Sequence, residues 1–343
     1  MVKRVTIKEV AHEAGVSIAM VSLVLHAKLD KDGNPECSVR KETAKRIFDA
    51  VKKLGYIPNR AAASIRSGRS YTIAVITSDI SNNFFSKICK HIENLAYDQG
   101  YSVIFASSDE SPAKFGRVLD MILRLSVDGM IIVPPPHSDM ALEKISTMNI
   151  PIVLLERDIP EIKNAGRVFL DNEFANHLAI NELYSSGYRR IELITYDLEI
   201  STIRSRVEGY KHVMAQLGLS DAAKVHYIEY GADVNAMSIL LQNAIKHGCE
   251  AVFLTTNTLS VLAFEAARLL KLDIPKDLAL VGFDYSHAFD VSCTSVSHVL
   301  QPIHKLGENS FSMLVEMIEE GAPGRTVLLY PTLAKGGSSA PRG

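Results

Sequence analysis

The chain has 343 residues, of which 47% are hydrophobic and 22% charged, so we expect two or three compact units rather than one. It holds no apolar run of about 18 residues, which argues against a membrane span, and its N-terminus turns polar too soon for a signal peptide. We therefore expect a cytoplasmic protein. The four cysteines lie far apart, without metal-site or disulfide spacing, and are interpreted as free thiols.

Charge is distributed unevenly along the chain. Residues 1–70 contain 14 Lys and Arg against 7 Asp and Glu, whereas the remainder contains 23 basic residues against 32 acidic ones. A basic head on an acidic body is typical of a protein whose one end meets phosphate, although a basic face can also simply be solvated. Charge alone therefore leaves nucleic-acid binding open.

The first sixty residues predict three short helices. Thr6 and Glu9 form a capping box at the start of the first helix, and Gly15 ends it. Ser17 can cap a second helix, and a third ends at Gly55. Small residues at the close approach and a positive φ at Gly15 are typical of a helix-turn-helix, although an ordinary helical hairpin uses the same residue types.

Beyond these helices the composition changes twice. Residues 58–70 are rich in Ala, Arg and Ser and predict a linker or a short, marginal helix. From Tyr71 onward, short apolar runs alternate with amphipathic stretches, which predicts an α/β domain of two doubly wound parallel-sheet subdomains. The expected strands are 73–76, 103–105, 129–133, 152–155, 191–194, 251–254 and 278–281. Such sheets bind ligands beyond the carboxyl ends of their strands, so the polar residues after these runs are candidate ligand contacts.

Several segments resemble, in the same order, the LacI/GalR family of bacterial transcription regulators. They include VTIKEVAHEAGVS, RAAASIRSGRS, VDGMIIVPP, RSRVEGY, IPKDLALVGFD and QPI, and they span essentially the whole chain. The resemblance implies an N-terminal all-α helix-turn-helix headpiece joined to a periplasmic-binding-protein-like effector domain. The implied boundaries are 1–58 for the headpiece, 59–70 for a hinge helix or linker and 71–343 for the effector-binding and dimerisation domain, with one subdomain of about 71–169 and 300–329 and another of about 170–299 and 330–343.

The resemblance further implies a homodimer that binds a palindromic operator. The second helix would lie in the major groove, and a hinge helix from Asn59 to about Arg66 would lie in the minor groove, where Ile65 aligns with a residue that wedges between base pairs. The candidate DNA contacts are Thr6, Ser17, Ile18, Ala19, Met20, Ser22, Leu23, His26, Arg40, Tyr56, Asn59, Arg60, Ala62 and Ile65.

Some of these positions depart from the family pattern. Met20, Leu23 and His26 stand where the family usually has Thr, Arg and Asn. Leu23 cannot make the bidentate guanine contact of an arginine. Either it packs on a thymine methyl, or base reading shifts to Ile18, Ala19 and the remaining polar groups. Arg40 replaces a capping serine, and the preceding turn is longer by roughly eight residues. These departures affect the operator sequence rather than the class of activity.

For the effector, the resemblance makes Arg206 the strongest candidate contact, because a planar guanidinium suits a sugar hydroxyl or a carboxylate. We expect its loss to weaken ligand binding without abolishing folding or DNA affinity. Asp284 and Asn257 follow predicted strands, where the family often carries pairs of polar side chains; Tyr285 and Thr258 replace the second acid of each pair. The candidate effector contacts are Asp79, Phe84, Arg157, Asp171, Arg206, Asn257 and Asp284.

No catalytic constellation, cofactor motif or metal-ligand spacing is evident, so we expect neither an enzyme nor a bound cofactor or metal. A sugar-binding transport protein is the main alternative, but it needs an export signal and no headpiece; a sugar-modifying enzyme needs a catalytic group. We therefore expect a ligand-responsive, sequence-specific DNA-binding transcription regulator, a repressor of carbohydrate-related genes. Its expected partners are double-stranded operator DNA, a second copy of the chain and a sugar, sugar phosphate or similar polar metabolite, with no membrane.

Overall fold

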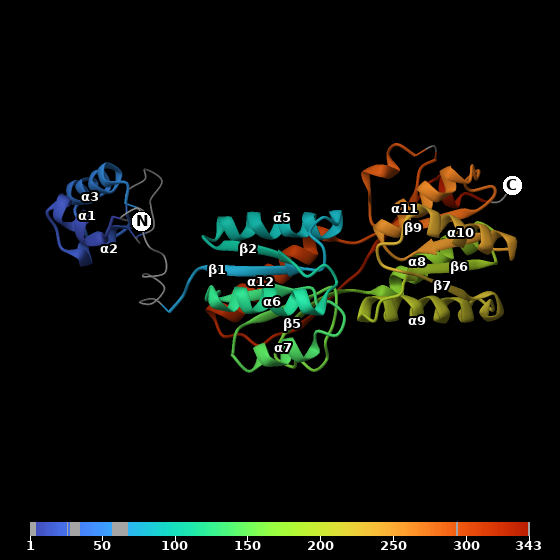
Figure 1. Ribbon diagram of the computed structural model, residues 1–343, viewed down its shortest axis with the longest axis horizontal. Helices are drawn as coiled ribbons and strands as arrows, with labels where there is room; N and C mark the ends of the chain where they lie inside the picture. The colour runs from blue at the N-terminus through green and yellow to red at the C-terminus, as the bar shows by residue number, and fades with distance from the viewer. Residues whose placement is uncertain (1–4, 26, 28–34, 57–67, 293, 342–343) are drawn as a thin grey trace. The chain divides into compact units, whose positions relative to one another are not determined.

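The protein divides into two compact units, Met1–Ser70 and Tyr71–Gly343 (Figure 1). The structure, a computed structural model, describes residues 5–25, 27, 35–56, 68–292 and 294–341. Within these ranges no helix combines the length and the apolar character that crossing a membrane requires.

The first unit is a cluster of three helices. These are α1 (Ile7–Ala14), α2 (Ile18–Leu25) and α3 (Lys41–Leu54). Their inner sides bring together Val10, Val21 and Ile47, all fully buried, in one apolar cluster. Since each helix spans only a few turns, this shared cluster rather than helix propensity stabilises the unit.

Local signals place the helix ends where the sequence predicts them. The Glu9 carboxylate accepts hydrogen bonds from the backbone N–H of Thr6 at 2.6 Å and from the Thr6 hydroxyl at 2.9 Å. Gly15 lies in the left-handed region at φ 62°, and the Ser17 hydroxyl accepts from the backbone N–H of Met20 at 3.2 Å. The predicted turn between α1 and α2 is therefore present.

The second unit consists of two lobes, each a six-stranded sheet with helices on both faces (Figure 1). The first lobe contains β1 (Thr72–Thr77), α5 (Asn83–Asp98), β2 (Ser102–Ser107), α6 (Pro112–Arg124), β3 (Gly129–Ile132), α7 (Asp139–Ser146), β4 (Ile152–Leu155), β5 (Gly166–Leu170), α12 (Ile303–Glu319) and β11 (Thr326–Leu329). The second contains α8 (Asn172–Ser185), β6 (Ile191–Tyr196), α9 (Ser201–Gln216), β7 (Lys224–Ile228), α10 (Val234–Lys246), β8 (Ala251–Leu254), α11 (Asn257–Leu269), β9 (Ala279–Phe283), β10 (Ser297–Leu300) and β12 (Thr332–Ala334).

Strand order explains how the chain builds two lobes. The first sheet runs β11-β5-β4-β3-β1-β2 and the second β12-β10-β9-β8-β6-β7. The chain passes between the sheets three times, after β5, after β10 and between β11 and β12. Because α12 packs on β3, β4 and β5, it completes the first lobe although it follows the whole of the second lobe up to β10.

All seven predicted strands are present, with ends that differ by at most two residues. The strands β5, β7, β10, β11 and β12 were not among those predicted. Three of them, β7, β11 and β12, lie at sheet edges and are partly exposed, so they lack an unbroken apolar run. In addition, β12 pairs antiparallel with β10, so the second sheet is parallel except at this edge.

Candidate ligand site and DNA interface

A small cavity of about 70 Å³ lies between the two lobes of the second unit. Its lining includes residues that follow β1, β2 and β4 in the first sheet and β6, β8 and β9 in the second. Carboxyl ends of parallel strands meet at one edge of a sheet, so this is where a doubly wound fold binds ligands. The position is the one that the sequence predicts for the ligand site.

Five of the seven predicted effector contacts line this cavity: Phe84, Arg157, Arg206, Asn257 and Asp284. Of the other two, Asp171 lines a larger neighbouring cavity, and Asp79 lines neither cavity. Asp79 accepts from the backbone N–H and hydroxyl of Ser81, and Asp171 caps α8 by accepting from the backbone N–H of Phe174. These two carboxylates organise a turn and a helix start in the described conformation.

Arg206 is buried and almost completely engaged by the protein. It donates from Nε to Asn172 Oδ1 at 2.8 Å, from one terminal nitrogen to the carbonyl oxygen of Thr255 at 2.7 Å, and from the other to Glu156 Oε1 at 3.0 Å. Its guanidinium also lies 4.0 Å from the ring centre of Phe283. Burial lowers the pKa of Arg206, and the Glu156 carboxylate acts in the opposite direction.

A second buried ion pair lines the same cavity. Both terminal nitrogens of Arg157 donate to the Glu110 carboxylate, at 2.7 and 2.6 Å, and one of them also donates to the carbonyl oxygen of Pro134. The Arg157 and Glu110 side chains are only 8% and 6% exposed. Each arginine of the cavity therefore already has its own carboxylate, and neither is an uncompensated cation.

Asp284 is the remaining charged group of the cavity. Gln301 donates to its Oδ2 at 3.0 Å. Burial raises the pKa of Asp284 to about 7, with a further upward contribution from Glu156, while the hydrogen bond from Gln301 and the charge of Arg206 lower it. This carboxyl group therefore changes its protonation state close to neutral pH.

Several buried polar atoms of the cavity lining lack a hydrogen-bond partner among the described residues. They are the acceptors Glu156 Oε2, Asp284 Oδ1 and Gln301 Oε1, and the donor Arg157 Nε. Most buried polar atoms in folded proteins are satisfied, and exceptions cluster where a ligand or water binds. This lining therefore offers three acceptors and one donor to an incoming molecule.

Backbone geometry marks the same carboxylates. Glu110, Glu156 and Asp284 have φ values of 55°, 68° and 58°, in the left-handed region that side chains other than glycine rarely adopt. Such conformations cost about 1–3 kcal/mol each and persist where the surrounding structure imposes them. Three such residues around one cavity indicate that the surrounding structure fixes where their carboxyl groups lie.

Direct bonds connect the lobes around the cavity. Glu156, which follows β4, bonds to Arg206 on α9; Asn257 Nδ2 donates to Asn82 Oδ1 at 3.0 Å. The backbone N–H of Asp158 also donates to the Ser201 hydroxyl at 2.8 Å. The described conformation is thus one in which the lobes are closed on each other.

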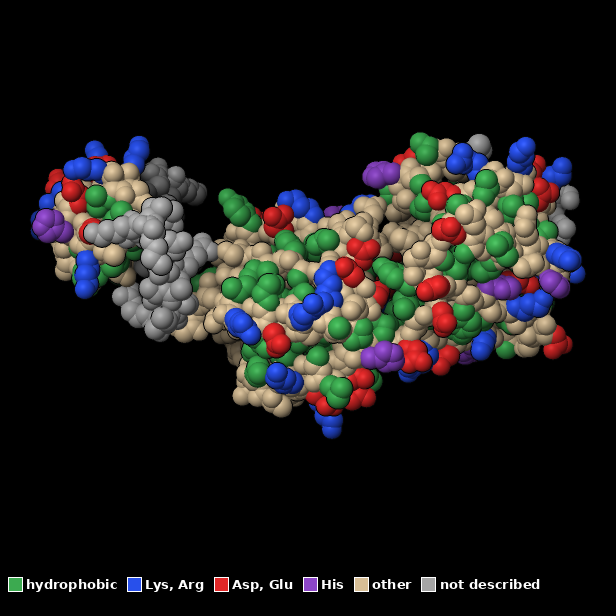
Figure 2. All heavy atoms as spheres, in the orientation of Figure 1, with side chains coloured by type: hydrophobic (Ala, Val, Ile, Leu, Met, Phe, Trp, Pro, Cys, Tyr) green, Lys and Arg blue, Asp and Glu red, His purple; other side chains and the backbone are tan. Residues whose placement is uncertain are grey.

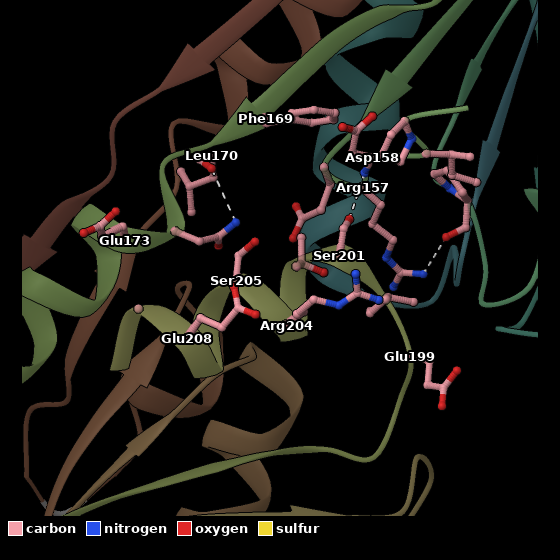
Figure 3. A pocket seen from close by; sticks show the side chains of 18 of the residues that line it. Arg157, Asp158, Phe169, Leu170, Glu173, Glu199, Ser201, Arg204, Ser205 and Glu208 are labelled. Carbon is pink, nitrogen blue, oxygen red and sulfur yellow. Dashed lines mark hydrogen bonds between the residues drawn. The ribbon is translucent and has the colours of Figure 1, made fainter. Parts of the chain in front are cut away.

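A larger cavity of about 820 Å³ shares four lining residues with the small one: Glu156, Arg157, Ile200 and Thr202. Figure 3 shows its lining, with Ser205 and Glu208 of α9 opposite Phe169 of β5. Carboxylates outnumber arginines in this lining, and Figure 2 shows Asp and Glu side chains on both sides of the junction between the lobes. Among the described residues, however, no group of His, Cys, Asp or Glu is arranged to hold a metal ion.

In the first unit, most predicted DNA contacts that the structure describes are exposed. Thr6, Ser17, Ile18, Ala19, Met20, Leu23 and Arg40 are exposed, Tyr56 is partly exposed, and Ser22 is buried. The predicted contacts His26, Asn59, Arg60, Ala62 and Ile65, and with them the expected hinge helix, lie outside the described residues. Arg40 precedes α3 and makes no side-chain capping bond there.

Sequence reasoning missed several members of the ligand site. Glu156 directly follows β4, so the rule that selected Arg157 could also have found it. Gln301 follows β10, which was not predicted, and Glu110 lies in a polar stretch after β2 that carries no distinctive pattern. The pairing of Glu156 with Arg206 joins residues 50 positions apart and has no local sequence signal.

Two family descriptions match parts of the chain. Residues 6–59 match "Bacterial regulatory proteins, lacI family", and residues 180–339 match "Periplasmic binding protein-like domain". The first match covers α1, α2 and α3, and the second covers most of the second lobe and α12.

Similar proteins match over nearly the full length. The ribose operon repressor of Halalkalibacterium halodurans is 30% identical over 318 residues, which cover 92% of this chain and 91% of that protein. Catabolite control protein A of Priestia megaterium is 28% identical over 333 residues, 95% of this chain and 96% of that protein. Among solved structures, the lac repressor dimer bound to operator and the anti-inducer ONPF has a TM-score of 0.82 at 22% identity, covering 98% of this chain and all of that one.

Proposed function

Because this chain belongs to the lacI family of bacterial regulatory proteins, it is a transcription regulator rather than an enzyme, and we propose that it couples two binding events. Residues 1–70 bind operator DNA, and the cavity between the lobes of residues 71–343 binds a neutral ligand rich in hydroxyl groups. The observation that supports this ligand class is the set of unpartnered buried acceptors beside two arginines that are already neutralised.

The charges around the small cavity disfavour an anionic ligand. Three carboxyl groups and two guanidinium groups line it, and each guanidinium group already has a carboxylate partner, so a phosphate or carboxylate would find no unpaired cation there. A hydroxyl group both donates and accepts. It can donate to Glu156, Asp284 and Gln301 and accept from Arg157 Nε, whereas an ammonium group has no acceptor for that last contact.

Ligand binding requires the lobes to separate. A volume of about 70 Å³ is far below the roughly 300–1,000 Å³ of ordinary ligand pockets. Opening would break the bond between Asn82 and Asn257 and move Glu156 relative to Arg206. A ligand that binds the more open state better shifts the population toward it, which gives the protein its response.

We further propose that the regulator acts as a homodimer on a palindromic operator in the cytoplasm. The similar lac repressor structure is a dimer bound to operator, which supports this arrangement. The ribose operon repressor is named for a sugar operon, which supports repression of carbohydrate-related genes. Operator binding fits the basic charge of the first unit, and regulation of carbohydrate-related genes fits the proposed hydroxyl-binding cavity of the second unit.

Titration calorimetry on the full chain tests the ligand class. Neutral monosaccharides and polyols, their phosphates, and nucleobases are compared at one pH. We expect binding only among the neutral hydroxyl compounds. At pH 8, above the pKa of about 7, Asp284 is ionised, and Asp284→Asn should weaken binding about 10- to 150-fold by removing a charged acceptor. The control Asp197→Asn changes an exposed carboxylate outside both cavities and should leave affinity unchanged. Tighter binding of a phosphorylated compound than of its neutral parent would contradict the proposal.

Selection from a random duplex pool tests DNA binding by the same full chain. We expect a palindromic sequence to be enriched, and the ligand found by calorimetry to change its affinity. A chain that enriches no sequence, or whose DNA affinity ignores the ligand, would refute the coupling.

A further inference from the structure

The exposed side of α2 is aliphatic. Ile18, Met20 and Leu23 are 43%, 37% and 46% exposed, and they are the large hydrophobic side chains exposed in the described part of the first unit. The other side of the helix is already occupied, because Val21 and Val24 are buried in the three-helix cluster. These three side chains are therefore not held in the core.

Polar groups are scarce on this helix. α2 contains no charged residue, and Ser22 is buried. The Ser17 hydroxyl just before it accepts from the backbone N–H of Met20. A helix that recognised base edges by hydrogen bonds would carry Arg, Asn, Gln or similar side chains, which α2 lacks.

The first unit also carries exposed basic side chains that can contact a phosphate backbone. Among the described residues of the first unit, the exposed basic ones are Lys8, Arg40, Lys41, Lys45, Arg46, Lys52 and Lys53. α2 follows α1 and the tight turn at Gly15, and the second helix of such a motif is the one that enters the major groove. Basic groups can thus hold the duplex while α2 meets base edges.

In the major groove the apolar group that distinguishes bases is the C5-methyl of thymine. We infer that α2 selects its operator through contacts between Ile18, Met20 and Leu23 and thymine methyl groups, so that each half-site carries A·T pairs under this helix. The inference rests on the proposed DNA-binding function and adds which chemical group of the DNA is recognised. Burial of one methyl group against an aliphatic side chain is worth about fourfold in affinity.

Deoxyuridine provides a direct test, because it keeps every hydrogen-bonding group of thymine and lacks only the methyl. In the duplex enriched by the full chain, each thymine is replaced in turn and the dissociation constant is measured. We expect about fourfold weaker binding at each thymine under α2 and no change at flanking thymines. At a position where cytosine can replace thymine without abolishing binding, 5-methylcytosine should bind more tightly than cytosine, because it restores the C5-methyl group.

A variant identifies the side chain. Leu23→Ala should remove the uracil penalty at one base position and leave it at the others, which is a double-mutant cycle between protein and DNA. Met121→Ala, which shortens a methionine 48% exposed on α6, is the matched control and should leave every penalty in place.

The outcomes separate the two proposals. Enrichment of a sequence whose affinity ignores uracil at every position would overturn methyl recognition and leave the DNA-binding function standing. An equal loss from Leu23→Ala on thymine and uracil duplexes would also overturn it, because Leu23 would then act by packing alone. Failure to enrich any sequence would instead refute the proposed function.

Discussion

Replacing Arg206 by alanine leaves a buried carboxylate without its cation. Arg206 is 4% exposed, and its loss removes the ion pair to Glu156, two further hydrogen bonds and the contact with the Phe283 ring. Breaking a buried pair from one side costs about 3–5 kcal/mol, chiefly because the remaining charge stays buried. We therefore expect Arg206→Ala to destabilise the second unit as well as to weaken ligand binding. The sequence predicts only that this variant still folds.

The magnitude can be read from thermal melts. For a unit of this size, about 2 °C of melting temperature corresponds to 1 kcal/mol, so the variant should melt about 6–10 °C below the natural chain. The double variant Arg206→Ala/Glu156→Gln removes the stranded charge and should recover a substantial part of this loss. Arg204→Ala removes an exposed arginine two positions earlier on α9. It is the control and should melt within about 1 °C of the natural chain.

Circular dichroism melts of the four proteins, with differential scanning calorimetry to separate the two units, supply these values. Equal melting temperatures for Arg206→Ala and the double variant would refute the reasoning, because they would show that the charge of Glu156 carries no penalty once Arg206 is gone.

Three further perturbations follow from the described contacts. The pKa of Asp284 is about 7 in the folded protein and 3.8 as the ordinary value, so between these values the folded state holds a proton that the unfolded chain releases. The free energy of unfolding should therefore fall by up to about 4 kcal/mol from pH 4 to pH 7, and Asp284→Asn should not show this fall. Thermal melts of both proteins across that pH range measure the difference. In Gly15→Ala the added methyl group would have no atom within 4 Å, but the alanine would have to adopt φ +62°, which is strained for any residue with a side chain. Amide exchange in the first unit should therefore rise about fivefold. The control Gly116→Ala has neither strain nor contact and should be neutral or mildly stabilising. Burial raises the pKa of Cys89 to about 12, so pulsed alkylation at pH 8 should label the partly exposed Cys37 and spare Cys89 until unfolding; labelling of both in the folded protein would contradict its burial.

Six of the seven predicted strands are almost entirely buried, and β2, a partly exposed edge strand, is the exception. β4 and β8 are unbroken apolar runs, and their bounds agree with the prediction to the residue. The edge strands β7 and β11 are only a few residues long and consist mostly of exposed and partly buried positions, which a short loop can imitate. Their assignment depends on the neighbouring strand, which local sequence does not reveal.

For the ligand site, too, the sequence predicts some features and not others. Topology brings residues after strand ends together, so Arg157, Asn257 and Asp284 could be selected from position alone. What each side chain does there depends on partners far along the chain. Arg206 could be selected as a ligand contact, but its engagement with Glu156 and Asn172 changes its role from a free contact to a group that connects the lobes.

The threading of the chain also bears on its synthesis. β3, β4 and β5 leave the ribosome long before α12, whose Phe311 and Leu314 cover the apolar side chains of Ile131 and Val153. Roughly 130 residues of the second lobe are translated in between, on the order of 10 s at ordinary elongation rates. Throughout that interval the nascent first sheet presents an uncovered apolar face beside a second lobe that is still emerging. Chaperone demand should therefore peak late in translation, and a premature stop just before α12 should yield an aggregating product even though the second lobe is nearly complete.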